Sequence, residues 1–198
     1  MRRIVKIGGS MLLRTDLTKA VNQWLAAHPA DQTLIIVGGG KLIDAVRELD
    51  QLHPLNQQQV HWTCVDLLTT TAHFVAQMFG WPLITNPSQW KAAFETPTIQ
   101  CLPTVIAPEV FYHQRSAPLQ HDKSGDTRHK LPVDWRTTTD SIAGLLSAIL
   151  DADELVLLKS CPIPATMSPT QLADVGIVDP VFPALAAQLA QVRIEQLL

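Results

Sequence analysis

The chain has 198 residues, of which 46% are hydrophobic and 17% charged, a composition typical of an ordered globular protein and not of a disordered one. Its net charge of −3 argues against a nucleic-acid-binding protein, because such proteins usually carry a basic excess. The three cysteines are far apart and fit neither a disulfide framework nor a zinc site, so we expect a cytoplasmic protein. No apolar run approaches the roughly 18 residues of a membrane span, so we expect no association with membranes.

Two short apolar runs near the start of the chain predict strands, and each run ends in glycines. The first run covers residues 3–7 and contains Lys6, and the second covers residues 33–37. Glycine lets the backbone approach a ligand closely and turn its N–H groups toward an anion, and lysine adds a mobile positive charge. The segments that follow the two runs are Gly8, Gly9 and Ser10, and Gly38, Gly39 and Gly40.

The rest of the sequence alternates between helical and strand patterns. Apolar residues recur at helical spacing over residues 17–25, 42–49, 56–78, 88–94, 138–149 and 181–190, and Ser168-Pro169 is a typical helix start. Further strands are expected over residues 83–85, 98–102, 154–158 and 192–197. This alternation predicts an α/β protein, a three-layer α/β/α sandwich around a mostly parallel sheet. We expect it to form a single domain over residues 1–198.

A polar stretch over residues 112–135 predicts a surface loop of about 20 residues, which is long for a compact domain. It contains three histidines and several basic residues, among them Lys123, Arg128 and Lys130. The spacing of the histidines fits no standard set of metal ligands, so we predict no metal site. Two interpretations of the basic residues stay open, a solvated surface loop or a loop that closes over an anionic substrate.

The two glycine segments together favour a phosphate site, although each alone is equally consistent with a tight strand-to-helix turn. In a parallel sheet, ligands gather at the carboxyl ends of the strands, where both glycine segments and Lys159 are expected to lie. Two common nucleotide-binding motifs do not fit. Ile35 stands where a P-loop needs its first glycine, and Ile43 stands where a dinucleotide-binding fingerprint needs its third.

Three sequence blocks, in this order, resemble the amino acid kinase family, which includes acetylglutamate, aspartate, carbamate and uridylate kinases. The blocks are 6–10 (Lys-Ile-Gly-Gly-Ser), 37–40 (Val-Gly-Gly-Gly) and 139–143 (Thr-Asp-Ser-Ile-Ala). Finer features resemble a small methanofuran-biosynthesis branch of this family, whose kinase acts on aminomethylfuran-methyl phosphate. These features are Leu131-Pro132 with Trp135, the pair His61-Trp62, and Gly176-Ile177-Val178-Asp179. The resemblance implies an amino acid kinase-like fold.

The resemblance also implies roles for individual residues. Lys6 would contact the transferring phosphoryl group, and Asp140 would stay ionised and orient the catalytic lysines. Many family members carry a second catalytic lysine in a late Gly-Gly-Met block that this chain lacks; Lys159 is the natural substitute, and a merely solvated lysine is the open alternative. The nucleotide would be bound by Gly8, Gly9, Ser10 and Lys159, and the acceptor by Gly38, Gly39, Gly40, His61 and Trp135. For His61 and Trp135, ordinary core packing stays open as a second interpretation.

These features predict an enzyme, a kinase that uses ATP and Mg²⁺ to phosphorylate an acidic oxygen, phosphate or carboxylate, of a small anionic molecule. Such a reaction asks the protein mainly to position its substrates and to neutralise charge. The specific candidate for the acceptor is aminomethylfuran-methyl phosphate, and analogy with the family predicts a homo-oligomer. Because the late lysine block is missing, a second interpretation stays open: a non-catalytic family member that binds a nucleotide or metabolite as a sensor or partner subunit.

Overall fold

The computed structural model describes residues 1–95, 102–113 and 131–198, and these residues contain one six-stranded sheet. Its strands lie in the order β3-β4-β2-β1-β5-β6, and every neighbouring pair is parallel. The bounds are β1 Arg2–Ile7, β2 Gln32–Val37, β3 Leu83–Ile84, β4 Thr104–Ile106, β5 Glu154–Lys159 and β6 Val192–Gln196. The predicted parallel sheet is confirmed, and no antiparallel strand joins it within the described part of the chain.

The three central strands, β2, β1 and β5, are built from nearly continuous apolar runs. Ile4 of β1 lies opposite Leu34 of β2 and Leu155 of β5, and all three side chains are fully buried. A strand that is covered by helices on both faces needs apolar residues in both directions. This is why the short runs at the start of the sequence could be recognised as strands.

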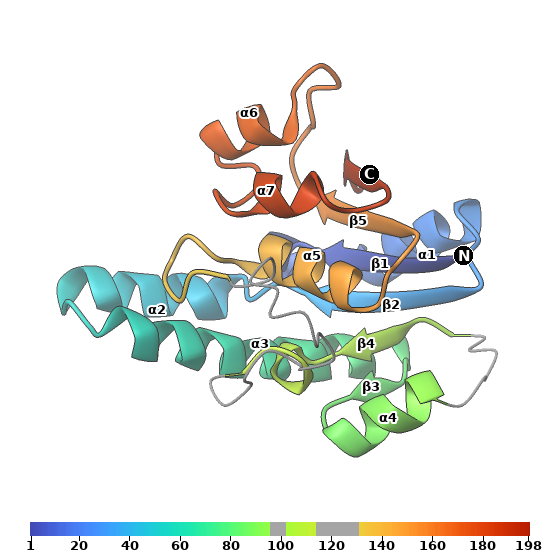
Figure 1. Ribbon diagram of the computed structural model, residues 1–198, viewed down its shortest axis with the longest axis horizontal. Coiled ribbons are helices and arrows are strands. Elements are labelled where there is room, and N and C mark those ends of the chain that lie inside the picture. The colour runs from blue at the N-terminus through green and yellow to red at the C-terminus, as the bar shows by residue number, and fades with distance from the viewer. Residues whose placement is uncertain (96–101, 114–130) are drawn as a thin grey trace.

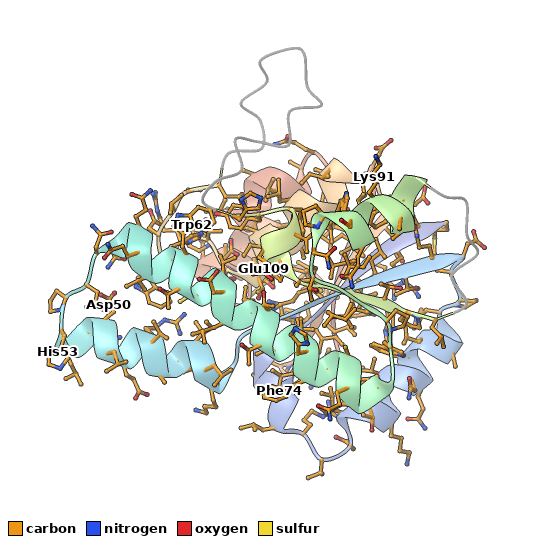
Figure 2. All side chains as sticks on the ribbon, turned by 90° about the horizontal axis from the view of Figure 1, so that it is seen from below. Asp50, His53, Trp62, Phe74, Lys91 and Glu109 are labelled. Carbon is orange, nitrogen blue, oxygen red and sulfur yellow. The ribbon has the colours of Figure 1, made fainter. Side chains whose placement is uncertain are left out.

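Helices cover both faces of the sheet, so the predicted three-layer sandwich is confirmed (Figure 1). In Figure 1, α5 crosses the sheet in front and α1 lies behind it. In Figure 2, Phe74 on α3 and Lys91 on α4 lie on opposite sides of the sheet. The bounds are α1 Leu17–Ala27, α2 Lys41–Leu52, α3 Gln57–Phe79, α4 Pro87–Glu95, α5 Thr139–Ile149, α6 Pro169–Asp174 and α7 Phe182–Ala186, with short 3₁₀ helices η1 Gly9–Leu13 and η2 Pro108–Val110. No helix among the described residues is both long and apolar enough to cross a membrane.

Side chains cap the first turn of several helices. Asn56 accepts a hydrogen bond from the Gln59 backbone at the start of α3, and Thr138 caps α5 in the same way. Ser168 forms a full capping box with Gln171 at the start of α6. Such caps satisfy N–H groups that have no partner inside the helix, and they fix where the chain leaves each loop.

Two predicted elements have different bounds in the structure. The strand expected over residues 98–102 lies largely outside the described residues, and the strand at this sheet position is β4, which follows Pro103. The reason is that Thr104–Ile106 is the fully buried segment that pairs with both β2 and β3. The last helix, expected to reach residue 190, ends at Ala186, because the chain turns back to pair β6 with β5. Most of the loop expected over residues 112–135, from 114 to 130, also lies outside the described residues.

The hairpin of α2 and α3 extends past the carboxyl ends of the strands (Figure 1). Asp50 and His53 lie near its tip, away from the sheet (Figure 2). The α2 helix has no buried residue, so it is held by the turn at its end and by its contacts with α3. The hairpin therefore flanks the end of the sheet at which the strands terminate and the glycine segments lie.

Candidate active site

The carboxyl ends of β1, β2 and β5 open into a cleft of about 520 Å³. Both glycine segments, the α2–α3 hairpin and the segments that precede α5 and α7 line it. All but one of the site residues expected from the sequence contribute to this lining: Lys6, Gly9, Ser10, Gly38, Gly39, Gly40, His61, Trp135, Asp140 and Lys159. Residues far apart in the sequence are thus brought to one end of the sheet, where parallel α/β proteins usually bind ligands.

A buried carboxylate between two buried lysines forms the floor of the cleft. Asp140 lies in the first turn of α5, Lys6 in β1 and Lys159 at the end of β5. The Lys159 Nζ donates a hydrogen bond to Asp140 Oδ2 at 2.7 Å, and the Lys6 Nζ lies 3.0 Å from Asp140 Oδ1 as an ion pair. That ion pair lacks hydrogen-bond geometry, so Oδ1 is a buried oxygen without a hydrogen-bond donor among the described residues.

The protonation states in this cluster follow from burial and from the neighbouring charges. Burial alone would raise the pKa of Asp140, but the charges of Lys6 and Lys159 outweigh it and hold that pKa below its ordinary value. Burial, together with the charge of Lys6, lowers the pKa of Lys159. Asp140 is therefore ionised at neutral pH, and it holds two ammonium groups close together where they can share a further anion.

The two glycine segments pack backbone against backbone. A Cβ added to Gly9 would lie 2.1 Å from the backbone nitrogen of Gly40, and a Cβ added to Gly38 would lie 2.5 Å from that of Gly9. Gly40 also has φ +53°, a conformation that side chains rarely allow. The glycines thus permit the two loops to meet, a contact that the sequence alone did not predict.

The N–H groups of the glycine segments are not all available to a ligand. The Gly8 N–H donates to the Leu158 carbonyl at 3.1 Å, and the Gly38 N–H donates to the Ile7 carbonyl at 2.9 Å. Gly8 is the one expected site residue that is not among the residues lining the cleft, and its N–H joins the first loop to β5. Gly9 opens η1 and Gly40 caps α2, where the first N–H groups have no acceptor inside the helix.

His61 lines the cleft with both ring nitrogens already bonded to the protein. Its Nδ1 lies 3.2 Å from the Asp134 carbonyl and its Nε2 lies 2.8 Å from the Tyr112 hydroxyl. Because a carbonyl only accepts, Nδ1 carries the proton and Nε2 accepts from Tyr112. Burial lowers the pKa of His61, which keeps the ring neutral. His61 therefore links α3 to the segment before α5. Neither ring nitrogen is free to bind the substrate that would accept a phosphoryl group.

Trp135 is held by the α2–α3 hairpin. Its indole Nε1 donates to Asp50 Oδ2 at 2.6 Å, and the Arg47 guanidinium lies 4.9 Å above its ring. Arg47 therefore covers one face of the ring of Trp135, a residue expected to bind the acceptor. Arg47 itself lines the cleft and has one protein acceptor among the described residues, Asp44 at 3.3 Å.

Three contributors to this region were not singled out as site residues from the sequence: Arg47, Asp50 and Asp179. Arg47 and Asp50 lie on an amphipathic helix and carry no local signal of a role. Asp179 had a signal that was not used, because it stands three residues before Phe182 and accepts from the backbone at the start of α7. An aspartate in that position is a typical helix-capping residue.

Comparisons with known proteins agree with the architecture. No protein-family model and no curated protein matches this sequence. Among solved structures, the chain is similar to a uridylate kinase from Archaeoglobus fulgidus, with TM-score 0.62 and 15% identity over 99% of this chain and 91% of that one. It is also similar to a UMP kinase from Ureaplasma parvum, with TM-score 0.63 and 11% identity over 99% and 89%.

A third similar structure is an aspartate kinase from Synechocystis, with TM-score 0.64 and 16% identity over 98% of this chain and 38% of that one. The chain has the amino acid kinase-like fold. This confirms the fold that the three sequence blocks implied. At these identities the amino acid kinase-like fold by itself does not define a reaction, so the function is argued from the cleft.

Proposed function

We propose that this protein is a kinase that transfers the γ-phosphoryl group of ATP to an anionic oxygen of a small molecule. The observation that carries the proposal is the buried pair of lysines, Lys6 and Lys159, held by Asp140 between two glycine loops. A phosphoryl group in transfer spreads negative charge over its equatorial oxygens. Two fixed ammonium groups beside free N–H donors are suited to that charge.

The residues act by position and charge. In the proposed step an acceptor oxygen forms a bond to the γ-phosphorus while the bond to the bridging oxygen of ADP breaks, and ADP carries that electron pair away. Lys6 and Lys159 stabilise the transferring group, and Asp140 holds both ammonium groups in place. An acceptor that is already a phosphate or carboxylate has an ionised oxygen, so no general base is needed.

The two sides of the cleft are assigned to different substrates. Gly9, Ser10 and Lys159 would bind the nucleotide phosphates, and the Ser10 hydroxyl is held 2.9 Å from the Ser160 hydroxyl. The acceptor would lie against Gly39 and Gly40, beside the α2–α3 hairpin. Arg47, stacked on Trp135, adds a positive charge on that side, which agrees with an anionic acceptor.

A magnesium ion would come with the nucleotide. No group of three acidic, histidine or cysteine side chains that could hold a metal is found among the described residues, and both oxygens of Asp140 face lysines. These residues fit an ion held through the phosphates, the usual arrangement for Mg²⁺ in kinases. When bound, the ion would neutralise phosphate charge.

The specific acceptor we propose is aminomethylfuran-methyl phosphate, on the strength of the residues that resemble the methanofuran branch. The test is ³¹P NMR of purified protein with ATP, Mg²⁺ and single acceptors: this phosphate, UMP and aspartate. We expect ADP to form together with a new diphosphate signal from the furan phosphate. A Lys6→Met variant purified in the same way controls for contaminating kinases. ATP binding without loss of any acceptor would instead support the non-catalytic interpretation.

A further inference from the structure

The block Gly176–Asp179 resembles the methanofuran branch, but none of its residues has a role in the reaction proposed above. Its last residue, Asp179, is buried, with 5% of its surface exposed, and lines the cleft. Its carboxylate collects hydrogen bonds from two helix starts. This concentration of donors on one buried side chain marks Asp179 as more than a solvated charge.

Each carboxylate oxygen of Asp179 accepts three hydrogen bonds. Oδ2 accepts from the Thr138 backbone at 3.0 Å, from the Thr138 hydroxyl at 2.9 Å and from the Ser141 backbone at 3.0 Å. Oδ1 accepts from the Val181 backbone at 3.1 Å, from the Phe182 backbone at 2.9 Å and from the Ser141 hydroxyl. Thr138 caps α5, and Ser141 lies with Asp140 in its first turn, so the two flank Asp140. The segment before α7 is thereby fastened to the turn that carries Asp140.

We propose that Asp179 is the positioning residue of the lysine cluster: it fixes the first turn of α5, and through Asp140 it places Lys6 and Lys159. This rests on the proposed function, because the cluster is assigned there to phosphoryl transfer. Small errors in placing catalytic groups are costly, and a shift of about 1 Å can reduce a rate on the order of 100-fold. Asp179 touches neither substrate in this account and acts only through its neighbours.

Asp179 also contributes charge to the cluster. The groups that face Lys159 are Lys6 from β1, Asp140 from α5 and Asp179 from the segment before α7. Burial and Lys6 lower the pKa of Lys159, whereas Asp140 and Asp179 act in the opposite direction. Loss of the Asp179 charge should therefore move the deprotonation of Lys159 to lower pH. The rate should then begin to fall at lower pH, because the cationic form of Lys159 is the active one.

Asp179→Asn is the main test. An amide offers one acceptor oxygen, so in either orientation two backbone N–H groups lose their acceptor: Val181 and Phe182, or Thr138 and Ser141. We expect kcat to fall about 10- to 100-fold, with little change in the Kd for ATP. In protein labelled with ¹³C at lysine Cε, the NMR titration of Lys159 should move to lower pH. Asp174→Asn, on the exposed surface of α6, is the matched control. It should change neither kcat nor the Lys159 titration.

Ser141→Ala provides a second variant if Asp179→Asn does not fold. It removes one hydroxyl donor but keeps the Asp179 charge and all its backbone hydrogen bonds. We expect kcat to fall several-fold while the Lys159 titration stays in place. Wild-type kcat in Ser141→Ala, or a wild-type Lys159 titration in folded Asp179→Asn, overturns the inference.

The lysine titration needs no substrate. Suppose that the wild-type protein turns over no acceptor while the Lys159 titration still moves in Asp179→Asn. That result would contradict the proposed kinase function and leave the charge contribution of Asp179 standing. Full turnover in folded Asp179→Asn would contradict this inference and leave the kinase function intact. The two failures are therefore distinguishable.

Discussion

Replacing Lys159 by methionine is expected to lower kcat for phosphoryl transfer about 100-fold or more, the usual effect of removing one preorganised electrostatic donor from a transition state. Methionine is one atom shorter than lysine but keeps most of the side chain, and it removes the charge that lies 2.7 Å from Asp140. The fold should persist, because Asp140 keeps its ion pair with Lys6. The measurement is steady-state kinetics with circular dichroism on the same sample.

Two further variants separate charge loss from structural damage. Lys19→Met on the exposed surface of α1 is the matched control and should leave kcat unchanged. Asp140→Asn should be more destabilising than Lys159→Met, because it leaves two buried ammonium groups without their carboxylate, a change that costs about 3–5 kcal/mol in comparable pairs. Folded Lys159→Met protein with wild-type kcat would show that Lys159 is only a structural partner of Asp140.

Gly9→Ala is expected to damage both activity and stability. The added methyl group would lie 2.1 Å from the Gly40 nitrogen and 2.7 Å from the Gly40 Cα, and backbone atoms cannot move aside as a flexible side chain can. The loops must separate, which we expect to cost about 1–3 kcal/mol, as overpacking does. The same separation displaces N–H donors on both sides of the cleft and should lower kcat about 100-fold. Thermal unfolding and kinetics on one preparation measure both effects.

Gly80→Ala is the control for substitution of glycine itself. Gly80 ends α3 with φ +66°, and a Cβ there would meet nothing within 4 Å. It should therefore lose about 1 kcal/mol of stability from backbone conformation alone and keep full activity. If Gly9→Ala retained wild-type kcat, the close contact of the two loops would have no part in catalysis.

Much of the fold was predictable because its signals are local. The strands β1 and β2 are apolar runs closed by glycines, and Asn56, Thr138 and Ser168 mark helix starts through capping that depends on a few neighbouring residues. The short strand β4 was not predicted, because its identity comes from pairing with β2 and β3 and not from its own three residues. The end of α7 was also misjudged, since pairing of β6 with β5 ends it.

The candidate site was predictable where a strand end or helix start defines it, as for Lys6, Lys159 and Asp140. Contacts across the tertiary structure were not predictable. No sequence pattern states that Gly9 touches Gly40, that Arg47 covers the ring of Trp135, or that the His61 nitrogens are both taken. Such features depend on how separate elements meet, which a single sequence does not encode locally.

A crystal structure with Mg²⁺ and a non-hydrolysable ATP analogue tests the central claim most directly. We expect the γ-phosphate to lie within hydrogen-bond reach, about 3 Å, of both the Lys6 and Lys159 ammonium groups. The adjoining phosphates should contact the N–H groups of the first glycine loop. A nucleotide bound outside this cleft, or with its γ-phosphate out of reach of both lysines, would contradict the account.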